Sequence, residues 1–561
     1  MTGTCVTEPL LCIPPFPGAR VTDFAVTATR AGHQAAPQTD LLALMRAARV
    51  GGAYWAAQPE LPQGDYLLVR TRDASMQAEA REQAAGPVVI WTDSAFYPGA
   101  PQEGVVVIQG EADPWHMLSR ARMLWTDADD EVAFIAALLG VPIGLSRTSG
   151  RFTELAHAGE GTLEATAARE LESWLWTDPF TGAPCPVERI IGYCAEWRQL
   201  IDANRPVSAA FGFGHWKQDT VDALLWGGGG AHTAFLSAQP DQLDALPAGS
   251  AIAVWKARVP DAFLAACEQS ARPLHEVEDG FIRSVGLGAD CVPPLSIIVD
   301  PVGVHYDPSC PSELENLLIG RKFTPDLLAR ARQLCTLVVE SRISKYEVGA
   351  ATPLPRPGGA RRHILVTGQV EDDRSVLTGG GDVRGNLDLL ARTRAAEPDA
   401  YILYKPHPDV LSGHRKGHVA EADALRHADT IVASQPISAL LDMVDGVHVL
   451  TSLAGFEALL RGKNVTTHGA PFYAGWGLTT DLGAVPARRR GHARTLDELV
   501  AATLLLYPRY LDPVTGLPCP AEILIERLKS GSARRKNAIL VLLRRAQGSL
   551  RRLFSGVVRA A

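Results

Sequence analysis

Two adjacent carboxylates are candidates for chemistry because a glycine and then an arginine follow them. They are Glu278 and Asp279 of the stretch VEDGFIRSVGLG, residues 277–288. Neighbouring carboxylates push their pKa values apart, which suits an acid/base pair or a nucleophile. The tripeptide alone also fits a surface turn, but Arg283 and the glycines beyond it favour a functional site. We therefore predict a turn that projects a carboxylate over a cleft.

A histidine between two prolines is a candidate for binding phosphate. His407 lies in YKPHPDV, residues 404–410, directly after a hydrophobic segment. The prolines restrict the backbone, so the imidazole can point rigidly into a cleft. A fixed imidazole beside Lys405 suits a phosphate group. A structural histidine in a proline turn is the alternative, and we favour the functional interpretation.

The stretch TSLAGFEALL, residues 451–460, has the pattern of a hydroxyl-capped helix start. Thr451 or Ser452 would cap the helix, and Gly455 would let a ligand approach the backbone. Free N–H groups and the helix dipole at such an end attract phosphate. Glu457 would face the same end and accept hydrogen bonds from ribose hydroxyls. An ordinary capped helix fits the pattern equally well.

A fourth polar stretch, GQVEDDRSV at residues 368–376, follows a predicted strand. Ligands of open parallel sheets bind at the carboxyl ends of strands. Gly368, Gln369 and Asp372 are therefore candidates for contacting a substrate or nucleotide, and a solvated acidic run is the alternative. Neither a DxD or HExxH motif nor a Cys/His cluster indicates a metal site, so we expect no metal and no other cofactor.

The segments that must position these residues alternate between strand and helix. Buried strands are predicted at 207–213, 251–255, 295–300, 363–368, 400–407 and 447–452. Helical patterns separate them, which predicts parallel sheets covered on both faces. A Pro/Gly-rich stretch at 346–362 indicates a linker between two such sheets. We therefore expect an α/β fold with a GT-B-like pair of Rossmann-type domains around a cleft.

An internal repeat indicates a second, incomplete module near the start of the chain. DPFTGAPCPVE (178–188) and DPVTGLPCPAE (512–522) agree at eight of eleven positions. A weaker echo relates FIAALLGVPI (134–143) to FEALLRGKNV (456–465), with Ile135 in place of the glutamate. Two related modules are predicted, of which the N-terminal one is shortened and degenerate.

Composition excludes several classes of protein. The chain has 46% hydrophobic and 21% charged residues and a net charge of −8, which is typical of a globular protein and gives no argument for a nucleic-acid partner. Its nine cysteines are scattered, which favours a reducing compartment. We see neither a signal peptide nor a membrane span, and we expect a cytoplasmic protein of several domains.

The last residues depart from this average. Lys529 to Ala561 contain nine Lys or Arg and no Asp or Glu, and apolar residues recur there at steps of three and four. A basic amphipathic helix of this kind can lie on an anionic membrane surface. A helix packed on its own protein is the alternative, and we favour the membrane.

Several strings together resemble the bacterial capsule polysaccharide β-Kdo transferases of the KpsC/LipA type. They are EDGFIRS, SKYEVG (344–349), GQVEDDRS, KPHPDV, TSLAGFEALLRGK, HGAPFYAGWGLT, GFGHWKQ (212–218) and the DPxTGxPCPxE repeat. The resemblance covers about 176–528 and is faint before it. It implies retaining transfer of Kdo (3-deoxy-D-manno-octulosonic acid) from CMP-β-Kdo to a (lyso)phosphatidylglycerol-linked Kdo acceptor, in the synthesis and export of the capsule linker. It also implies a peripheral enzyme on the inner face of the inner membrane.

The resemblance implies roles for the candidate residues. Asp279 would be the nucleophile or base, Glu278 its acid/base or orienting neighbour, and Arg283 the partner of the Kdo carboxylate. The CMP and its phosphate would contact His407, Lys405, Ser452, Thr451, Gly455 and Glu457, and the substrate would contact Gly368, Gln369 and Asp372. A donor with a single phosphate agrees with the absence of a metal motif.

It also implies a division of the chain into parts. These are a truncated Rossmann-like remnant (1–175), an acceptor-side half with the EDG motif (176–350), a CMP-sugar half (351–510), a closing turn and helix (511–528) and the basic tail (529–561). The first module lacks the EDG and KPHP motifs, so we expect one active site and one linkage type. Alternating linkages would require a second Kdo transferase or a capsule export complex as partner. A transferase for another CMP-activated acidic sugar and a non-catalytic capsule-assembly scaffold stay open.

Overall fold

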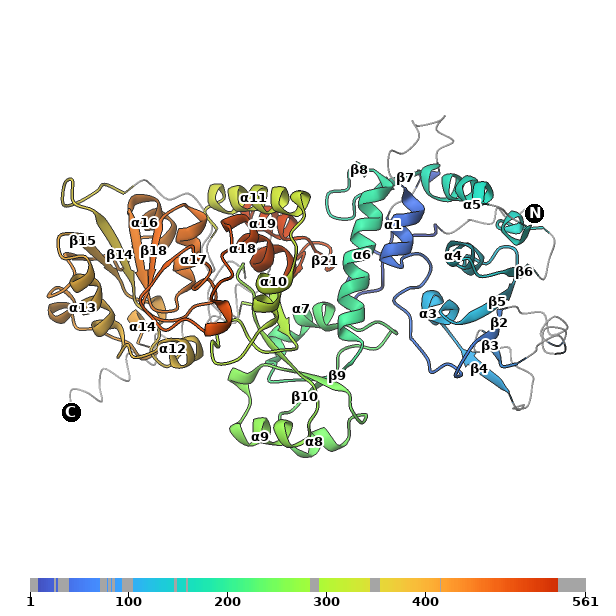
Figure 1. Ribbon diagram of the computed structural model, residues 1–561, viewed down its shortest axis with the longest axis horizontal. Helices are drawn as coiled ribbons and strands as arrows, with labels where there is room; N and C mark the ends of the chain where they lie inside the picture. Colours follow the sequence, from blue (N-terminus) through green and yellow to red (C-terminus); the bar gives the residue numbers. More distant parts are fainter. Residues whose placement is uncertain are drawn as a thin grey trace. The chain divides into compact units, whose positions relative to one another are not determined.

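The computed structural model divides the chain into two compact units (Figure 1). The first comprises Met1–Pro206, Leu225–Thr233 and Thr515–Leu517, and the second comprises Val207–Leu224, Ala234–Val514 and Pro518–Ala561. The residues that the structure describes are 9–24, 27–28, 40–70, 78, 82, 86–92, 104–145, 149–157, 160–282, 292–343, 354–413 and 415–532. Arg283, the SKYEVG stretch and most of the basic tail therefore lie outside the described residues.

The first unit contains a parallel sheet of five strands in the order β4-β3-β2-β5-β6. In chain order this is 3-2-1-4-5, the winding of a Rossmann-type fold. Its elements are α1 (Leu41–Ala48), β2 (Tyr66–Arg70), β3 (Val88–Thr92), β4 (Val105–Gln109), α3 (Pro114–Leu118), β5 (Ala121–Thr126), α4 (Val132–Leu139) and β6 (Ile143–Leu145).

A small second sheet and a long helix complete the first unit. The sheet has the order β1-β7-β8, and its neighbours run antiparallel. These elements are β1 (Thr27–Ala28), η1 (Thr153–His157), α5 (Glu160–Ala167), the π-helical η2 (Ala168–Glu172), β7 (Trp174–Thr177), β8 (Pro184–Cys185) and α6 (Val187–Asn204).

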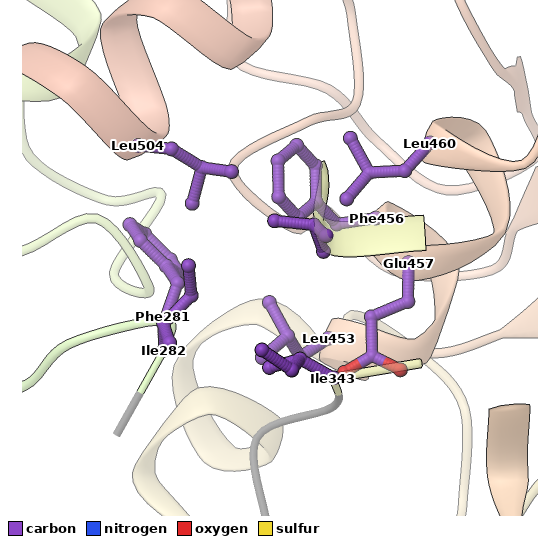
Figure 2. A pocket seen from close by; sticks show the side chains of 9 residues that line it. Phe281, Ile282, Ile343, Leu453, Phe456, Glu457, Leu460 and Leu504 are labelled. Carbon is purple, nitrogen blue, oxygen red and sulfur yellow. The ribbon is translucent and has the colours of Figure 1, made fainter. Parts of the chain in front are cut away.

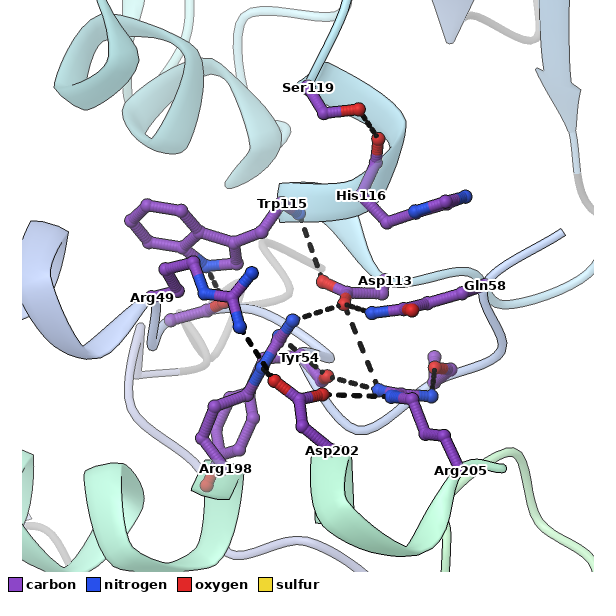
Figure 3. A network of polar contacts seen from close by, with 12 residues as sticks. Arg49, Tyr54, Gln58, Asp113, Trp115, His116, Ser119, Arg198, Asp202 and Arg205 are labelled. Atoms are coloured by element: carbon purple, nitrogen blue, oxygen red, sulfur yellow. Dashed lines mark hydrogen bonds and ion pairs between the residues drawn. The ribbon is translucent and has the colours of Figure 1, made fainter. Parts of the chain in front are cut away.

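Buried charges tie α6 to the rest of this unit (Figure 3). Arg198 of α6 is 2% exposed and lies 2.7 Å from Asp113, which precedes α3 and is fully buried. The same guanidinium donates to the carbonyl of Tyr54 at 2.9 Å and to Asp202 at 2.8 Å. Buried ions are tolerated only when they are paired in this way. This network joins α6 to the first unit, which explains why the compact unit continues to Pro206. The boundary predicted at residue 175 separates two sequence repeats and not two compact units, and it stays a prediction.

The second unit contains a mixed sheet of seven strands in the order β10-β9-β11-β12-β13-β20-β21. β10, β9, β11 and β12 run parallel, whereas β13, β20 and β21 are antiparallel to their neighbours. Part of this sheet thus departs from the parallel arrangement that alternation predicts. Its elements are β9 (Val207–Phe211), α7 (His215–Leu225), β10 (Phe235–Leu236), α8 (Asp241–Asp244), β11 (Ala251–Val254), η3 (Lys256–Arg258), α9 (Asp261–Gln269), β12 (Leu274–Asp279), β13 (Ser296–Asp300), α10 (Glu313–Gly320) and α11 (Pro325–Glu340).

A fully parallel sheet of six strands follows in the same unit, in the order β16-β15-β14-β17-β18-β19. Every residue of β14 is buried, as expected for a central strand between two helical layers. Helix α13 lies on one face, and α16 and α17 lie on the other (Figure 1). The elements are β14 (His363–Thr367), α12 (Arg374–Gly379), α13 (Asn386–Ala396), β15 (Tyr401–Lys405), α14 (Pro408–Leu411), α15 (Glu421–Ala424), β16 (Thr430–Ile431), α16 (Ile437–Met443), β17 (Gly446–Val449), α17 (Leu453–Leu460), β18 (Asn464–Thr467) and β19 (Thr480–Asp481).

The chain ends its described part by returning to the seven-stranded sheet. It does so through η5 (Ala487–Arg489), α18 (Leu496–Val500), the π-helical η6 (Ala501–Leu506), β20 (Pro508–Leu511), β21 (Pro518–Cys519) and α19 (Ala521–Lys529). All six predicted strand segments contain a strand. The predicted fold class is therefore confirmed: an α/β, GT-B-like pair of Rossmann-type sheets with a shortened N-terminal module.

The sequence repeat is also a repeat of structure. The succession β5, α4, β6, α5, η2, β7, β8, α6 recurs as β17, α17, β18, α18, η6, β20, β21, α19, with small additions in each copy. The shared Asp-Pro turn is built alike, because Asp178 accepts from the backbone N–H of Phe180 and Asp512 accepts from that of Val514. The N-terminal sheet therefore corresponds to the six-stranded sheet of the second unit and not to the seven-stranded one.

Candidate active site

Three of the predicted stretches meet at the carboxyl edge of the six-stranded sheet. Gly368 follows β14, His407 follows β15 by two residues, and Thr451 follows β17 by two residues. β14 lies between β15 and β17, and strand spacing in a sheet is about 5 Å. The chain order reverses between β14 and β17, which is where ligands of such sheets bind. The predicted phosphate-binding residues thus share one edge of one sheet.

Two predicted residues hold each other across this switch point. The amide of Gln369 donates to the hydroxyl of Thr451 at 2.9 Å and accepts from the Thr451 backbone N–H at 2.8 Å. The backbone of Gln369 is itself fixed by the side chain of Asn386, which it contacts in both directions at 2.8 Å. The loops after β14 and β17 therefore form one rigid surface.

Ser452 caps α17, as predicted, because its hydroxyl accepts from the backbone N–H of Ala454 at 3.2 Å. The glycine in the first turn has a packing reason. A Cβ on Gly455 would lie 2.2 Å from the hydroxyl oxygen of Tyr473, which donates to the Ser452 carbonyl. The aromatic residue thus supports the tip of the helix from inside the protein. The role of Gly455 toward a ligand stays a prediction.

The aromatic loop after β18 belongs to the core. Tyr473, Ala474 and Trp476 are completely buried. Arg489 donates to the carbonyls of Pro471 at 2.6 Å and Ala474 at 3.1 Å, and its guanidinium lies 2.5 Å from Glu315 of α10. The loop is therefore stiff, and it is joined by a buried ion pair to the part of the unit that carries the seven-stranded sheet.

The basic residues of YKPHPDV are oriented differently from each other. Lys405 is buried, and its ammonium group donates to the carbonyl of Gln435 at 2.7 Å. His407 caps α14 with Nδ1, which accepts from the Asp409 N–H at 3.1 Å. A neutral ring in this tautomer carries its proton on Nε2, which is the form that donates to a phosphate oxygen.

Gly368 and Asp372 are the remaining predicted residues near the carboxyl edge of the six-stranded sheet. The backbone N–H of Gly368 donates to the Lys405 carbonyl at 2.8 Å, and a Cβ there would lie 2.7 Å from the hydroxyl of Tyr404. Asp372 is exposed and pairs with Arg415 at 3.1 Å. Gly368 therefore serves close packing, while Asp372 lies on the surface of the loop.

The two carboxylates of the EDG motif end a strand and have separate partners. Glu278 and Asp279 are the last residues of β12, where successive side chains point to opposite faces. Glu278 accepts from the backbone N–H of Asp279 at 2.9 Å. Asp279 lies 3.5 Å from the ammonium group of Lys217. The Glu-Asp-Gly tripeptide had predicted a turn here, but Glu278 and Asp279 instead belong to an inner strand.

Tyr306 connects the neighbourhood of β12 with the six-stranded sheet. Its hydroxyl donates to Glu276 of β12 at 2.9 Å, and its carbonyl accepts from Thr378 of α12 at 3.2 Å. Burial raises the pKa of Tyr306 well above its usual value, and the charges of Glu276 and Glu278 raise it further. The phenol therefore stays protonated and acts as a donor.

The end of β12 also packs directly on α17. The ring of Phe281 lies 4.8 Å from that of Phe472 and 6.3 Å from that of Phe456, between centroids. A cavity of about 20 Å³, room for roughly one water molecule, lies beside these rings (Figure 2). Glu457 lines this cavity together with apolar side chains, among them Leu453 and Ile343. The segment that follows Asp279 thus packs on the helix that Ser452 caps.

Sequence reasoning missed two residues of this region. Lys217 belongs to GFGHWKQ, one of the strings on which the family resemblance rests. The resemblance assigned no role to any residue of that string. The place of Lys217 at the start of the helix that follows the parallel strand β9 is the signal that could have found it. Tyr306 lies in a loop without a motif, and only the fold reveals its contacts.

The comparisons with known proteins identify the family of the chain. A family model described as "Capsule polysaccharide biosynthesis protein" matches residues 250–352 and 338–510. The capsule polysaccharide modification protein LipA of Neisseria meningitidis (serogroup A / serotype 4A) is 39% identical over 366 residues, which are 65% of this chain and 51% of LipA. The chain belongs to the capsule polysaccharide biosynthesis family of the KpsC/LipA type.

Two further similar proteins show how far the likeness extends. The lipopolysaccharide-processing protein LpsZ of Rhizobium meliloti is 44% identical over 295 residues, which are 52% of this chain and 63% of LpsZ. A solved structure of Thermosulfurimonas dismutans KpsC, titled beta Kdo 2,4 transferase, has 33% identity and a TM-score of 0.49, and covers 57% of this chain and 98% of that one. The chain spans about half to two thirds of the length of the curated relatives it matches.

The described residues contain neither a cluster of metal ligands nor a helix that could span a membrane. Within the ranges given above, three or more His, Cys, Asp or Glu side chains do not gather where they could hold a metal ion. In those same ranges, every helix is too short or too polar to span a lipid bilayer.

Proposed function

We propose that this family member is a retaining glycosyltransferase that moves Kdo from CMP-β-Kdo to a Kdo acceptor linked to (lyso)phosphatidylglycerol. One observation carries the proposal: the strand end with Asp279 packs, through Phe281, on the helix whose tip Ser452 caps. A donor lying between them would place its phosphate against the helix tip and its sugar toward the carboxylate. The family and its relative LipA support a role in capsule synthesis.

The proposed reaction consists of two displacements. The Asp279 carboxylate attacks the anomeric carbon, the bond from that carbon to the phosphate oxygen breaks, and CMP leaves. An acceptor hydroxyl then attacks the same carbon, the bond to Asp279 breaks, and the hydroxyl proton passes to a base. Two inversions retain the configuration. His407 and the amides of α17 would stabilise the charge on the departing phosphate, and such preorganised donors lower a barrier most.

Purified protein with CMP-β-Kdo and a lipid-linked Kdo acceptor tests the proposal. We expect release of CMP and an acceptor that is longer by one Kdo, and mass spectrometry detects both products. Asp279→Asn and His407→Ala should each lower kcat/KM by about a hundredfold or more. Asp423→Asn, which replaces a half-buried carboxylate on α15 that pairs with Arg426, is the matched control and should keep full activity. Normal turnover in both site variants would overturn the assignment.

The same preparation separates the alternatives. A transferase for another CMP-activated acidic sugar would bind CMP but leave CMP-β-Kdo intact, and a scaffold would show no CMP binding in calorimetry. We also propose that the basic tail beyond residue 532 holds the enzyme on the inner face of the inner membrane. Sedimentation with phosphatidylglycerol vesicles tests this, because a chain shortened to residue 532 should remain in solution.

A further inference from the structure

Lys217 is placed beside the proposed nucleophile by the turn that follows β9. It is the third residue of α7, and its side chain is 6% exposed. Gly212 makes the turn with φ +84, and a Cβ there would lie 2.8 Å from the Trp255 carbonyl oxygen. The missing side chain therefore lets the start of α7 lie against the end of β11. A lysine so deeply buried requires compensation for the water that its ammonium group loses.

Two contacts supply that compensation. The ammonium nitrogen lies 3.1 Å from the centroid of the Trp255 ring and 3.5 Å from Oδ1 of Asp279. The ring offers its negative face to the cation, and the carboxylate offers its charge. Since β9, β11 and β12 are neighbouring parallel strands, the three groups come from three adjacent carboxyl ends. Such a set is rigid because each member belongs to a different strand end.

Other charges near β12 have partners of their own. Glu276 pairs with Lys256 at 2.5 Å and accepts from Tyr306. Glu278 accepts from the backbone of its neighbour. On the adjacent strand β13, the residue opposite Asp279 is the apolar Ile297. Lys217 pairs with Asp279 as a buried cation.

We propose that Lys217 is the positioning residue of the glycosyl transfer: held on the face of Trp255, it fixes the carboxylate of Asp279 and keeps it charged for attack on the sugar. This rests on the proposed function. In the first displacement the carboxylate must be ionised, and a neighbouring ammonium favours that form. In the second displacement the same carboxylate departs from the sugar with its negative charge, and the ammonium stabilises it again.

Lys217→Met tests this through the pH profile of kcat/KM. Loss of the cation raises the pKa of the carboxylate, so the acid limb of the profile should move up by about one pH unit or more. On the acid limb, kcat/KM of Lys217→Met relative to the wild type should be about tenfold lower than the same ratio at high pH. Lys217→Arg keeps the charge and should keep the limb near its original place. Lys322→Met, which removes an exposed lysine of the same unit, is the control and should leave the profile unchanged.

A second measurement follows the intermediate. If the departing carboxylate loses its stabilisation, glycosyl-enzyme should accumulate, and intact-protein mass spectrometry should show a larger fraction of chain with added Kdo in Lys217→Met. CMP affinity by calorimetry checks that the variant is folded. Should it not fold, Trp255→Phe keeps the ion pair and should shift the acid limb in the same direction by less.

The outcomes are distinguishable. A wild-type protein without transfer from CMP-β-Kdo overturns the proposed function and this inference with it. A wild-type enzyme that is active, together with a Lys217→Met variant whose acid limb and adduct fraction are unchanged, overturns the inference alone. The inference would also be contradicted if the acid limb of the pH profile stayed in place in Lys217→Met but moved in Lys217→Arg. The charge at this position would then have no effect on the carboxylate.

Discussion

The first turn of α17 shows how one glycine couples packing to a binding site. Gly455 leaves the space that the hydroxyl of Tyr473 fills, and that hydroxyl holds the carbonyl of the capping residue Ser452. Any side chain at this position must displace the tyrosine or tilt the helix. A tilted helix would aim its N–H groups away from the position proposed for the phosphate.

We expect Gly455→Ala to lower the free energy of unfolding by about 1–3 kcal/mol, the usual cost of overpacking a core. CMP affinity should fall as well, because the helix tip moves. Adding Tyr473→Phe to the Gly455→Ala variant should restore part of the stability and part of the CMP affinity. The reason is that this change removes the hydroxyl oxygen that lies nearest to the added Cβ. Gly192→Ala is the matched control, because a Cβ there meets nothing within 4 Å. Urea unfolding and calorimetry provide the measurements; unchanged values would refute the packing argument.

Two strands of the six-stranded sheet are joined by a pair of buried histidines. His448 of β17 lies 3.1 Å from His468, the residue after β18, between ring nitrogens. Burial, together with the smaller effect of the neighbouring ring, lowers the pKa of His448 to about 3, and burial likewise lowers the pKa of His468 to about 4. Both rings are thus neutral in the folded protein at pH values where an unfolded chain already binds protons.

This pair makes the sheet sensitive to acid. In the unfolded chain both histidines titrate near 6.5, well above their pKa values in the folded protein. Stability is therefore fully present above pH 6.5 and is lost as the pH falls, by roughly 1–2 kcal/mol per histidine at pH 5. His468→Asn should reduce the loss between pH 7 and pH 5, whereas His418→Asn, on the surface, should not. Melting temperatures at both pH values test this, and equal losses in all three proteins would contradict it.

The alternation of apolar segments and helices was enough to predict six strands and the doubly wound class. The site was predicted only in part. Periodicity could not identify β12, because its polar residues are paired with Lys256, Tyr306 and Lys217 from other segments. It could not identify the pairing of β13 with β20 either, since their residues are far apart in the chain. Such long-range contacts leave no local signal in a single sequence.

At the scale of the whole molecule, the N-terminal unit repeats the six-stranded sheet without the residues proposed to bind CMP. When FIAALLGVPI (134–143) is aligned with FEALLRGKNV (456–465), Asp130 occupies the position of Ser452. Its carboxylate lies 2.8 Å from Arg70, at the end of β2, and accepts from the Val132 N–H at the start of α4. The helix tip is therefore already occupied by a negative charge of the chain itself, which disfavours phosphate.

One CMP molecule should therefore bind to each chain. Calorimetry should give a stoichiometry of one, and His407→Ala should weaken or remove that single event. Two binding events in the wild type, or an undiminished event in the variant, would show that the N-terminal unit binds nucleotide.

The pairing of β20 with β13 has a consequence for synthesis on the ribosome. Residues 296–300 leave the exit tunnel long before residues 508–511, yet the two segments are neighbours in one sheet. The strand next to β12 therefore waits with an open edge while the whole nucleotide half is translated, and such edges invite wrong partners. Nascent chains stalled before residue 508 should thus depend on chaperones more strongly than chains released after α19.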